Sequence, residues 1–259
     1  MDVLSNFIDQ NHDEIKRDYD EASFLYPFWQ NYPPDDRGRM PKGDQFPWIE
    51  VGEHVFCPKL SRFLSKIFSI RDSGLPTGPD NRYIISNHEI HRILEITNSV
   101  WLFVDIKSVG PRDDKKHAVM SHNQISGKGE WTDLKLGIKI DIMEAKGQRA
   151  THKFHCAIPP IFVLSDGTIA PVVHIVLKPV YEMLGLTNGE RGQPLSRVTL
   201  ASIPNGILLT DNPNYLRDFP GLLFPGKDDK GKDPRKVRAR VSFEKLRQIA
   251  EWRYKDFDF

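Results

Sequence analysis

The chain has 259 residues, enough for one large domain or two small ones with a sizeable core. Hydrophobic residues make up 39% and charged residues 27%, a balance typical of globular proteins that excludes wholesale disorder. The 36 lysines and arginines nearly cancel the 35 aspartates and glutamates, giving a formal charge of +1. Any affinity for a polyanion must therefore come from local clusters of charge.

Cysteine usage and the apolar segments indicate where the protein resides. The two cysteines, Cys57 and Cys156, are too few for a disulfide framework and favour a reducing compartment. Residues 1–5 are not a basic region followed by an apolar one, so we expect no secretory signal. The most apolar stretch, 161–177, is interrupted by turn residues at 165–168 and cannot form a membrane span. We expect a soluble cytoplasmic protein with no membrane partner.

The first part of the chain is predicted to be mainly helical. Polar residues 2–21 favour a helix, and apolar residues in 60–67 recur at i, i+3, i+4 and i+7, which predicts an amphipathic helix after Pro58. A further short helix is expected within 90–97. Residues 73–80 are rich in glycine and proline and predict a turn that ends at Asp80.

The rest of the chain is predicted to be rich in strands. Residues 100–104 form a short, continuous apolar run with β-branched and aromatic side chains, which indicates a buried strand. Two hairpins are predicted, one joining 161–164 to 172–177 and one joining 198–203 to 207–209. This order of elements predicts an α/β fold with a mixed central β-sheet flanked by helices. Without repeats or a low-complexity linker, residues 1–259 are expected to form a single domain.

An acidic and lysine group follows the buried strand. Because side chains alternate along a strand, Asp105 and Lys107 are expected on one face and Ile106 on the other. With Asp80, this group could hold a divalent cation against a phosphate, with the carboxylates of Asp80 and Asp105 and the carbonyl of Ile106 as ligands. Lys107 would orient an attacking water or neutralise charge on the phosphate. This arrangement suits a Mg²⁺-dependent phosphodiesterase.

The sequence alone also allows non-catalytic, structural roles for these acidic residues. Asp105 and Lys107 could be an ordinary ion pair at the end of a surface strand, because D-x-K occurs by chance in many proteins. Glu50 and Glu53 are candidates for a further acidic group near the metal. A strand and turn with solvated carboxylates is the simpler explanation for these two residues.

Residues 227–240 carry a mixed charge cluster. Seven basic side chains stand against three acidic ones, which gives a local charge of about +4 and suits DNA. The interleaved aspartates favour base reading, because lysine or arginine can bond guanine O6 and N7 while aspartate accepts from cytosine N4. A solvated loop is the alternative. The pairs His88 with His91 and His152 with His155 lack partners at zinc-finger spacing and are expected to be structural or surface residues.

Together, Pro79-Asp80 and Asp105-Ile106-Lys107 resemble the PD-(D/E)XK nuclease signature. Longer strings resemble the BglI family of type II restriction endonucleases, in collinear order from about residue 18 to residue 240. These strings lie at 28–34 (FWQNYPP), 40–45 (MPKGDQ), 74–80 (GLPTGPD), 103–113 (FVDIKSVGPRD), 164–174 (LSDGTIAPVVH) and 225–229 (PGKDD). Such long strings are far more specific than the short signature.

The resemblance implies a restriction-endonuclease-like PD-(D/E)XK fold and a homodimeric, Mg²⁺-dependent endonuclease. Such an enzyme makes double-strand breaks with 5′-phosphate ends in duplex DNA at an interrupted palindrome similar to GCCNNNNNGGC. A single domain would then combine the catalytic core, a DNA-recognition loop and dimerisation elements. A cognate DNA methyltransferase would act on the same site without needing to bind the protein.

The resemblance also implies residue roles. Asp80 and Asp105 match metal ligands, Lys107 a catalytic lysine, and Glu53 an additional active-site acid. Four residues match positions that read base edges in the major groove, and these are Lys227, Asp229, Asp113 and Arg238. Residues 230–236 depart from the pattern, so Arg238 is matched through the Arg-x-Arg-Val string alone. The rival functions are another PD-(D/E)XK nuclease acting on branched or non-palindromic DNA, and a DNA-binding protein without catalysis.

Overall fold

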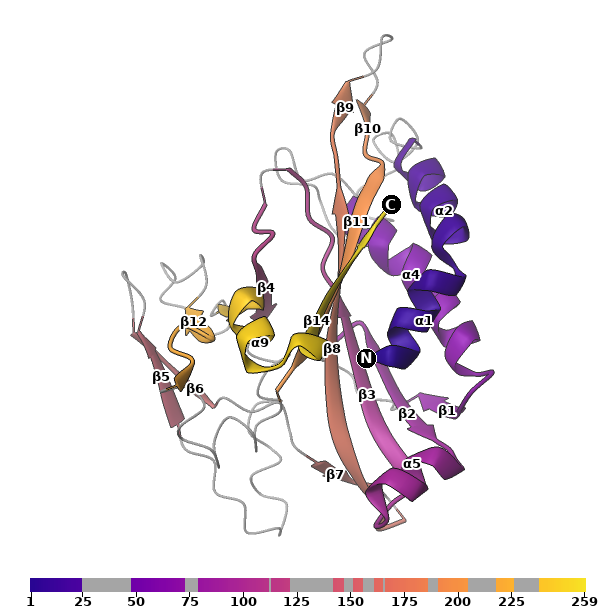
Figure 1. Cartoon of the computed structure of the whole chain (residues 1–259), viewed down its shortest axis with the longest axis vertical. Coiled ribbons are helices and arrows are strands. Elements are labelled where there is room, and N and C mark those ends of the chain that lie inside the picture. The colour runs from indigo at the N-terminus through magenta and orange to yellow at the C-terminus, as the bar shows by residue number, and fades with distance from the viewer. Residues whose placement is uncertain are drawn as a thin grey trace, which may run out of the picture.

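The computed structural model describes the chain in segments. These are residues 1–24, 48–72, 79–111, 113–121, 142–146, 151–155, 161–164, 166–185, 191–204, 218–225 and 238–259. A long twisted sheet runs through the molecule, with helices on one face and a smaller sheet with a short helix on the other (Figure 1). This is the expected α/β architecture with a mixed central sheet flanked by helices.

The central sheet has the order β1-β2-β3-β8-β11-β14, and β7 also pairs with β8. The strands are β1 (Ser69–Asp72), β2 (Asn81–Ser86), β3 (Ser99–Ile106), β7 (Ile161–Val163), β8 (Ile169–Tyr181), β11 (Leu195–Ile203) and β14 (Tyr254–Asp258). The β3–β8 pair is parallel and the other pairs are antiparallel, so the sheet is mixed. Every residue of β3 is buried, as expected for a central strand covered on both faces.

The helical layer consists of α1 (Asp2–Gln10), α2 (His12–Phe24) and α4 (Trp48–Leu64) (Figure 1). The single helix predicted for residues 2–21 is broken at Asn11, whose side-chain amide donates to the carbonyl of Phe7 at 2.7 Å. The helix predicted after Pro58 begins earlier, at Trp48, so Pro58 lies inside α4. The strand and turn considered for the segment with Glu50 and Glu53 is therefore wrong.

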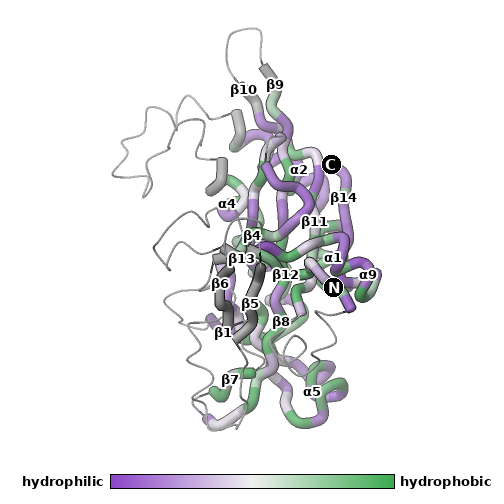
Figure 2. The backbone as a smooth tube through the Cα atoms, turned by 90° about the vertical axis from the view of Figure 1, so that its left-hand side faces the viewer, coloured by the Kyte–Doolittle hydropathy of each residue, from purple (hydrophilic) through white to green (hydrophobic). Residues whose placement is uncertain are grey.

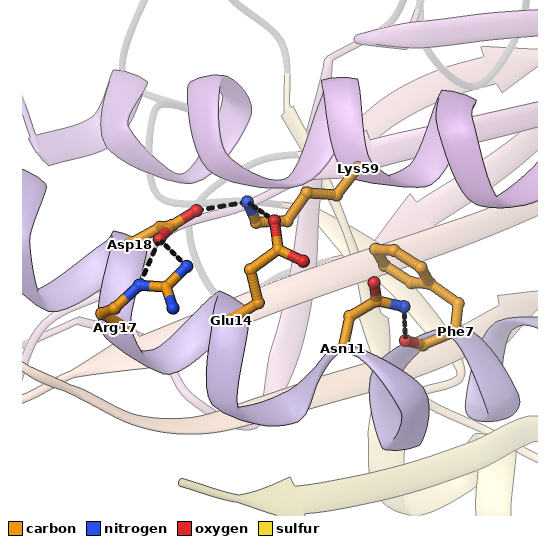
Figure 3. Close-up of polar contacts among 6 residues, drawn as sticks. All are labelled: Phe7, Asn11, Glu14, Arg17, Asp18 and Lys59. Carbon is orange, nitrogen blue, oxygen red and sulfur yellow. Dashed lines mark hydrogen bonds and ion pairs between the residues drawn. The ribbon is translucent and has the colours of Figure 1, made fainter.

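Lys59 ties α4 to α2. Its ammonium is 2.9 Å from Glu14 Oε1 and also contacts Asp18, while Arg17 holds the other side of Asp18 at 2.9 Å (Figure 3). Only 8% of the Lys59 side chain is exposed, so its charge is largely removed from water and must be paired. Burial opposes the charged form, but the two carboxylates outweigh it and raise the pKa of Lys59.

Alternation along β3 divides the core in two. Leu102, Val104 and Ile106 pack with the helical layer, whereas Trp101 and Phe103 pack with the smaller sheet. Because side chains alternate along β3, neighbouring residues at its carboxyl end belong to opposite faces of the sheet. Both hydrophobic clusters therefore hold that end in place.

The smaller sheet has the order β12-β13-β4 and is covered by α9. The remaining elements are β4 (His117–Ser121), β5 (Ile142–Lys146), β6 (Thr151–His155), β9 (Leu184–Gly185), β10 (Arg191–Gly192), β12 (Leu223–Pro225), β13 (Arg238–Ser242), α5 (His88–Leu94), α9 (Phe243–Ile249) and the 3₁₀ turn η4 (Glu251–Arg253). Figure 2 shows α5 and β7 at the end of the molecule opposite β9 and β10. There Ile93 and Val163 remain exposed.

Local predictions in the strand-rich part are confirmed where the structure describes them. The first hairpin forms between β7 and β8, although β7 pairs with residues 169–171 and the expected partner segment 172–177 pairs with β3 and β11 instead. Gly167 in its turn lies in the left-handed region at φ 84°. The first strand of the second hairpin is β11, while its expected turn and return strand lie outside the described residues. The helix expected within 90–97 is α5. No described helix is long and apolar enough to span a membrane.

Candidate active site

Asp105 and Lys107 meet at the carboxyl end of β3. Lys107 Nζ lies 3.0 Å from Asp105 Oδ1 and 2.9 Å from Oδ2, which confirms that the two side chains share a face. The Asp105 side chain is fully buried, whereas 28% of the Lys107 side chain is exposed. A buried carboxylate needs a paired cation, and the partly exposed ammonium leaves the pair accessible from one side.

Asp80 immediately precedes β2 and is joined to the same strand end. Its Oδ2 accepts a hydrogen bond from the main-chain N–H of Ile106 at 2.6 Å. The antiparallel register pairs Asn81 with Val104, which brings Asp80 beside Asp105. Asp80 is exposed and Asp105 is buried, so the two carboxylates form an inner and an outer group at one edge of the sheet.

Glu53 reaches this region from α4. It lies one turn before Cys57, and Asn81 Nδ2 donates to the Cys57 sulfur at 3.0 Å. Burial raises the pKa of the Cys57 thiol to about 11, and the negative charges of Asp80 and Glu53 add to this rise. Both carboxylates therefore act on Cys57, and the Asn81–Cys57 contact ties this part of α4 to the start of β2.

The donor set fits a hard divalent cation. Asp80 and Asp105 offer carboxylate oxygens, and the carbonyl of Ile106 stands between Asp105 and Lys107 in the chain. Within the described ranges, no group of three or more His, Cys, Asp or Glu side chains is arranged to hold a metal ion. Mg²⁺ keeps several waters and needs few protein carboxylates, so a sparse set of oxygen ligands suits it better than a metal that requires a full protein cage.

Sequence reasoning missed His174, which lies on β8 on the same sheet face as Asp105. It is paired in register with Phe103 and is 1% exposed. Neither ring nitrogen has a hydrogen-bond partner within the described part of the chain. Burial, with a smaller contribution from the positive charge of Lys107, lowers the pKa of His174 to about 3. The available signal was a lone histidine inside the apolar run 172–177.

A buried lysine on the same strand was also missed. Lys178 is 2% exposed and donates to the main-chain carbonyls of Asp114 and His117, the latter at 2.6 Å. Burial lowers the pKa of Lys178 to about 8, while nearby carboxylates such as Asp114 oppose the fall. Lys178 thus ties β8 to the loop that joins β3 to β4.

Asp114 links that loop to the smaller sheet. Its carboxylate is 2.8 Å from His117 Nδ1 and 3.3 Å from the Arg240 guanidinium on β13. Burial works against the charged form, but the contacts with His117 and Arg240 hold the pKa of Asp114 below its usual range. The loop after β3 and the smaller sheet therefore share one charged junction.

The predicted base-reading residues are only partly placed. Asp113 is exposed next to this junction, and its Oδ2 accepts from the main-chain N–H of Gly110 at 2.8 Å. Arg238 begins β13, where its backbone pairs with Ser121. Lys227 and Asp229 lie outside the described residues. The strands that flank them, β12 and β13, are adjacent and antiparallel.

Comparisons with known proteins show the family of this chain. The model of the family described as restriction endonuclease BglI matches residues 1–257. The type II restriction enzyme BglI from Bacillus subtilis is 48% identical over 254 residues, which cover 96% of this chain and 85% of that protein.

Solved structures give the same result. The crystal structure of BglI bound to its DNA recognition sequence matches with a TM-score of 0.85, covering 99% of this chain and 87% of that one. Tetrameric SfiI bound to cognate DNA matches with a TM-score of 0.57 at 14% identity, over 97% of this chain and 86% of that one. The second likeness concerns the fold alone. By its family match, its identity to BglI and its structure, the chain belongs to the BglI family of type II restriction endonucleases.

Proposed function

We propose that the protein is a Mg²⁺-dependent endonuclease that cuts double-stranded DNA at an interrupted palindrome similar to GCCNNNNNGGC. The products would be double-strand breaks with 5′-phosphate ends. The observation that carries this proposal is the assembly of Asp80, Asp105 and Lys107 at one strand end. The identity of 48% to BglI supports the assignment of the substrate class.

The proposed chemistry is in-line attack of water on the scissile phosphorus, with charge developing on the leaving 3′ oxygen. Asp80, Asp105 and the carbonyl of Ile106 would hold Mg²⁺, which supplies positive charge beside the phosphate and makes water more acidic. Asp105 keeps Lys107 at the site, where the ammonium orients the attacking water and neutralises charge on the phosphate. The main-chain N–H of Ile106 fixes one oxygen of Asp80, so this carboxylate does not need to reorganise on binding.

Glu53 is proposed as the additional acid of the site. Its place on α4 near Cys57 and Asp80 supports this role. Its carboxylate arrives from the helical layer, whereas Asp80 and Asp105 come from adjacent strands. The acids would therefore surround the scissile phosphate from different elements of the fold.

Sequence recognition is proposed for Lys227, Asp229, Asp113 and Arg238. A lysine or arginine donates to guanine and an aspartate accepts from cytosine, so together they can read G·C pairs in the major groove. A good bidentate contact contributes about 1–3 kcal/mol of discrimination against a wrong base. The adjacency of β12 and β13 and the exposed position of Asp113 support a reading surface on the smaller sheet.

A homodimer follows from the proposed target. Two identical half-sites related by a twofold axis are read by two identical subunits. We propose that residues 1–259 form a single domain that contains the catalytic core, the recognition loop and the dimer contacts, and that the protein acts in the cytoplasm. A cognate DNA methyltransferase would modify the same sequence without binding this protein.

The catalytic assignment is tested by substitution of Lys107. Lys107→Ala should abolish DNA cleavage in Mg²⁺ while sequence-specific binding persists in a mobility-shift assay, because the base-reading residues are separate. Chelation of the metal should stop the parent enzyme, and added Mg²⁺ should restore it. Cleavage by Lys107→Ala at the parent rate would remove this residue from the mechanism.

The recognition assignment is tested by Asp229→Ala. This variant should weaken cutting or relax its specificity at one position of each half-site, because one acceptor for a cytosine amino group is lost. An unchanged fragment pattern and rate would exclude Asp229 from base reading and favour a nuclease of the same class that acts on branched or non-palindromic DNA.

A further inference from the structure

Gly52 is the point where α4 comes closest to the carboxyl end of β3. Gly52 is buried, and a methyl group on it would overlap the hydroxyl oxygen of Ser108. The same methyl group would stand 3.3 Å from Ile106 Cγ2 and 3.5 Å from Pro179 Cγ. Glycine is unfavourable inside a helix compared with alanine, so its presence here needs a packing reason. The close approach to Ser108 supplies that reason.

This contact joins the segments that carry the proposed catalytic groups. Gly52 immediately precedes Glu53, while Ile106 and Ser108 stand on either side of Lys107 in the chain. Tyr19 of α2 is 1% exposed and lies next to Ser108. Burial raises the pKa of the Tyr19 phenol, and the neighbouring Ser108 hydroxyl opposes that rise. The helical layer therefore packs directly against the two residues that flank Lys107 in the chain.

A second contact fixes α4 one turn further on. Asn81 is 6% exposed, and its amide donates to the Cys57 sulfur at 3.0 Å and accepts from the Tyr83 hydroxyl at 2.7 Å. Asn81 directly follows Asp80 in the chain, so the same amide anchors the backbone next to that carboxylate. Glu53 lies between the Gly52 contact and the Cys57 contact, which together fix its place along α4.

We propose that Gly52 and Ser108 form a positioning pair for catalysis. The missing side chain at position 52 sets the separation of α4 from β3, and this separation sets how far Glu53 stands from the strand end that carries Asp80 and Asp105. The inference rests on the proposed role of Glu53 as an active-site acid. Gly52 and Ser108 act only through the position of Glu53, so a change at Gly52 should lower kcat without weakening recognition of DNA.

The test is a steric rescue in a Cys156→Ser background, with the full-length protein and Mg²⁺. Gly52→Ala should lower kcat about 100-fold, the scale of an error of about 1 Å in the position of a catalytic group. DNA affinity, measured without Mg²⁺, should stay within about threefold of the parent value. Gly52→Ala combined with Ser108→Ala should recover kcat to within about tenfold, because loss of the Ser108 oxygen removes the overlap. His54→Ala, at an exposed position of the same helix, is the matched control and should cut like the parent.

A second readout does not depend on DNA cleavage. Cys57 is half-buried further along α4, where it contacts Asn81, and in this background it is the sole cysteine. Gly52→Ala should increase the rate at which iodoacetamide alkylates Cys57 at a fixed pH, because the helix is lifted, and the added Ser108→Ala should reverse the increase. This measurement reports on the contact even if the parent protein does not cut DNA.

The outcomes separate this inference from the proposed function. Unchanged kcat and unchanged alkylation in Gly52→Ala would overturn the inference, as would a loss of kcat that Ser108→Ala does not rescue. Cleavage by Glu53→Gln at the parent rate would show that Glu53 is not an active-site acid. The positioning role of Gly52 and Ser108 would then be overturned as well. An inactive Glu53→Gln together with a failed rescue would overturn the Gly52 inference alone.

Discussion

At the scale of single residues, the site contains an ion pair, Asp105 with Lys107, and beside it a neutral histidine, His174. Asp105 is fully buried, and the Lys107 ammonium lies 2.9 Å from its carboxylate. His174, on the same sheet face, is held neutral by burial and by the positive charge of Lys107. His174 therefore adds no positive charge beside the Asp105–Lys107 pair.

The depressed pKa of His174 predicts a pH-dependent stability. Above pH 6.5 the residue is neutral in both the folded and the unfolded chain. As the pH falls below 6.5, the unfolded chain binds a proton that the folded chain does not bind until about pH 3, so the free energy of unfolding decreases. At pH 5.5 the contribution lost is about 1.4 kcal/mol.

His174→Phe keeps an aromatic ring and removes this titration. Denaturant unfolding at pH 7.5 and 5.5 should show a smaller loss of stability in the variant than in the parent. The other titrating groups are common to both proteins, so the difference between the two losses isolates His174. Equal losses would contradict a neutral, buried His174.

At the scale of elements, helices α2 and α4 are joined by the buried ammonium of Lys59. Lys59→Ala removes the cation between Glu14 and Asp18 and should lower the free energy of unfolding by about 1–2 kcal/mol. The figure is moderate because the two carboxylates are themselves partly exposed and screened by water. Arg92→Ala, which breaks the exposed Arg92–Glu89 pair on α5, is the control and should leave stability unchanged, because water screens this pair. Equal effects of the two substitutions would contradict the assigned burial of Lys59.

The junction at Asp114 couples the loop after β3 to the smaller sheet. Asp114→Asn should weaken its contacts with His117 and Arg240 and so loosen the place of Asp113, one of the proposed base readers. We expect the ratio of cleavage rates at cognate and singly mismatched sites to fall about tenfold, equivalent to about 1.4 kcal/mol of discrimination.

The matched control for Asp114→Asn is Asp166→Asn. Asp166 is exposed in the β7–β8 turn, where its carboxylate accepts from the N–H of Thr168. Asp166→Asn should leave the ratio of cleavage rates at cognate and mismatched sites unchanged. A parent-like ratio in Asp114→Asn would show that this junction does not contribute to specificity.

At the scale of the whole molecule, the sequence predicted correctly the features that depend on the local geometry of one strand or helix. The shared face of Asp105 and Lys107 follows from the alternation of side chains along one strand, and the structure confirms it. The fold class followed from the order of helical and strand patterns. By contrast, the contact of Asp80 with the Ile106 N–H depends on the register of β2 against β3, which no local pattern reveals.

The helical layer shows the limit of sequence reasoning most clearly. The segment that begins at Trp48 was expected to be a strand and turn, yet α4 forms there and continues through Pro58. Packing against the sheet overrides local propensity at such positions, and the roles of Gly52 and Cys57 exist only after that packing. The place of Glu53 could be inferred from resemblance to a family, but not from its own sequence context.

The proposed function requires that this chain cut duplex DNA at one defined interrupted palindrome. The most direct measurement is to digest a phage genome with the protein and Mg²⁺ and to sequence the fragment ends. Discrete fragments whose ends all fall within GCCNNNNNGGC-like sites, at one fixed position on each strand, are the predicted result. Uncut DNA, a smear, or ends without a common sequence would contradict the claim.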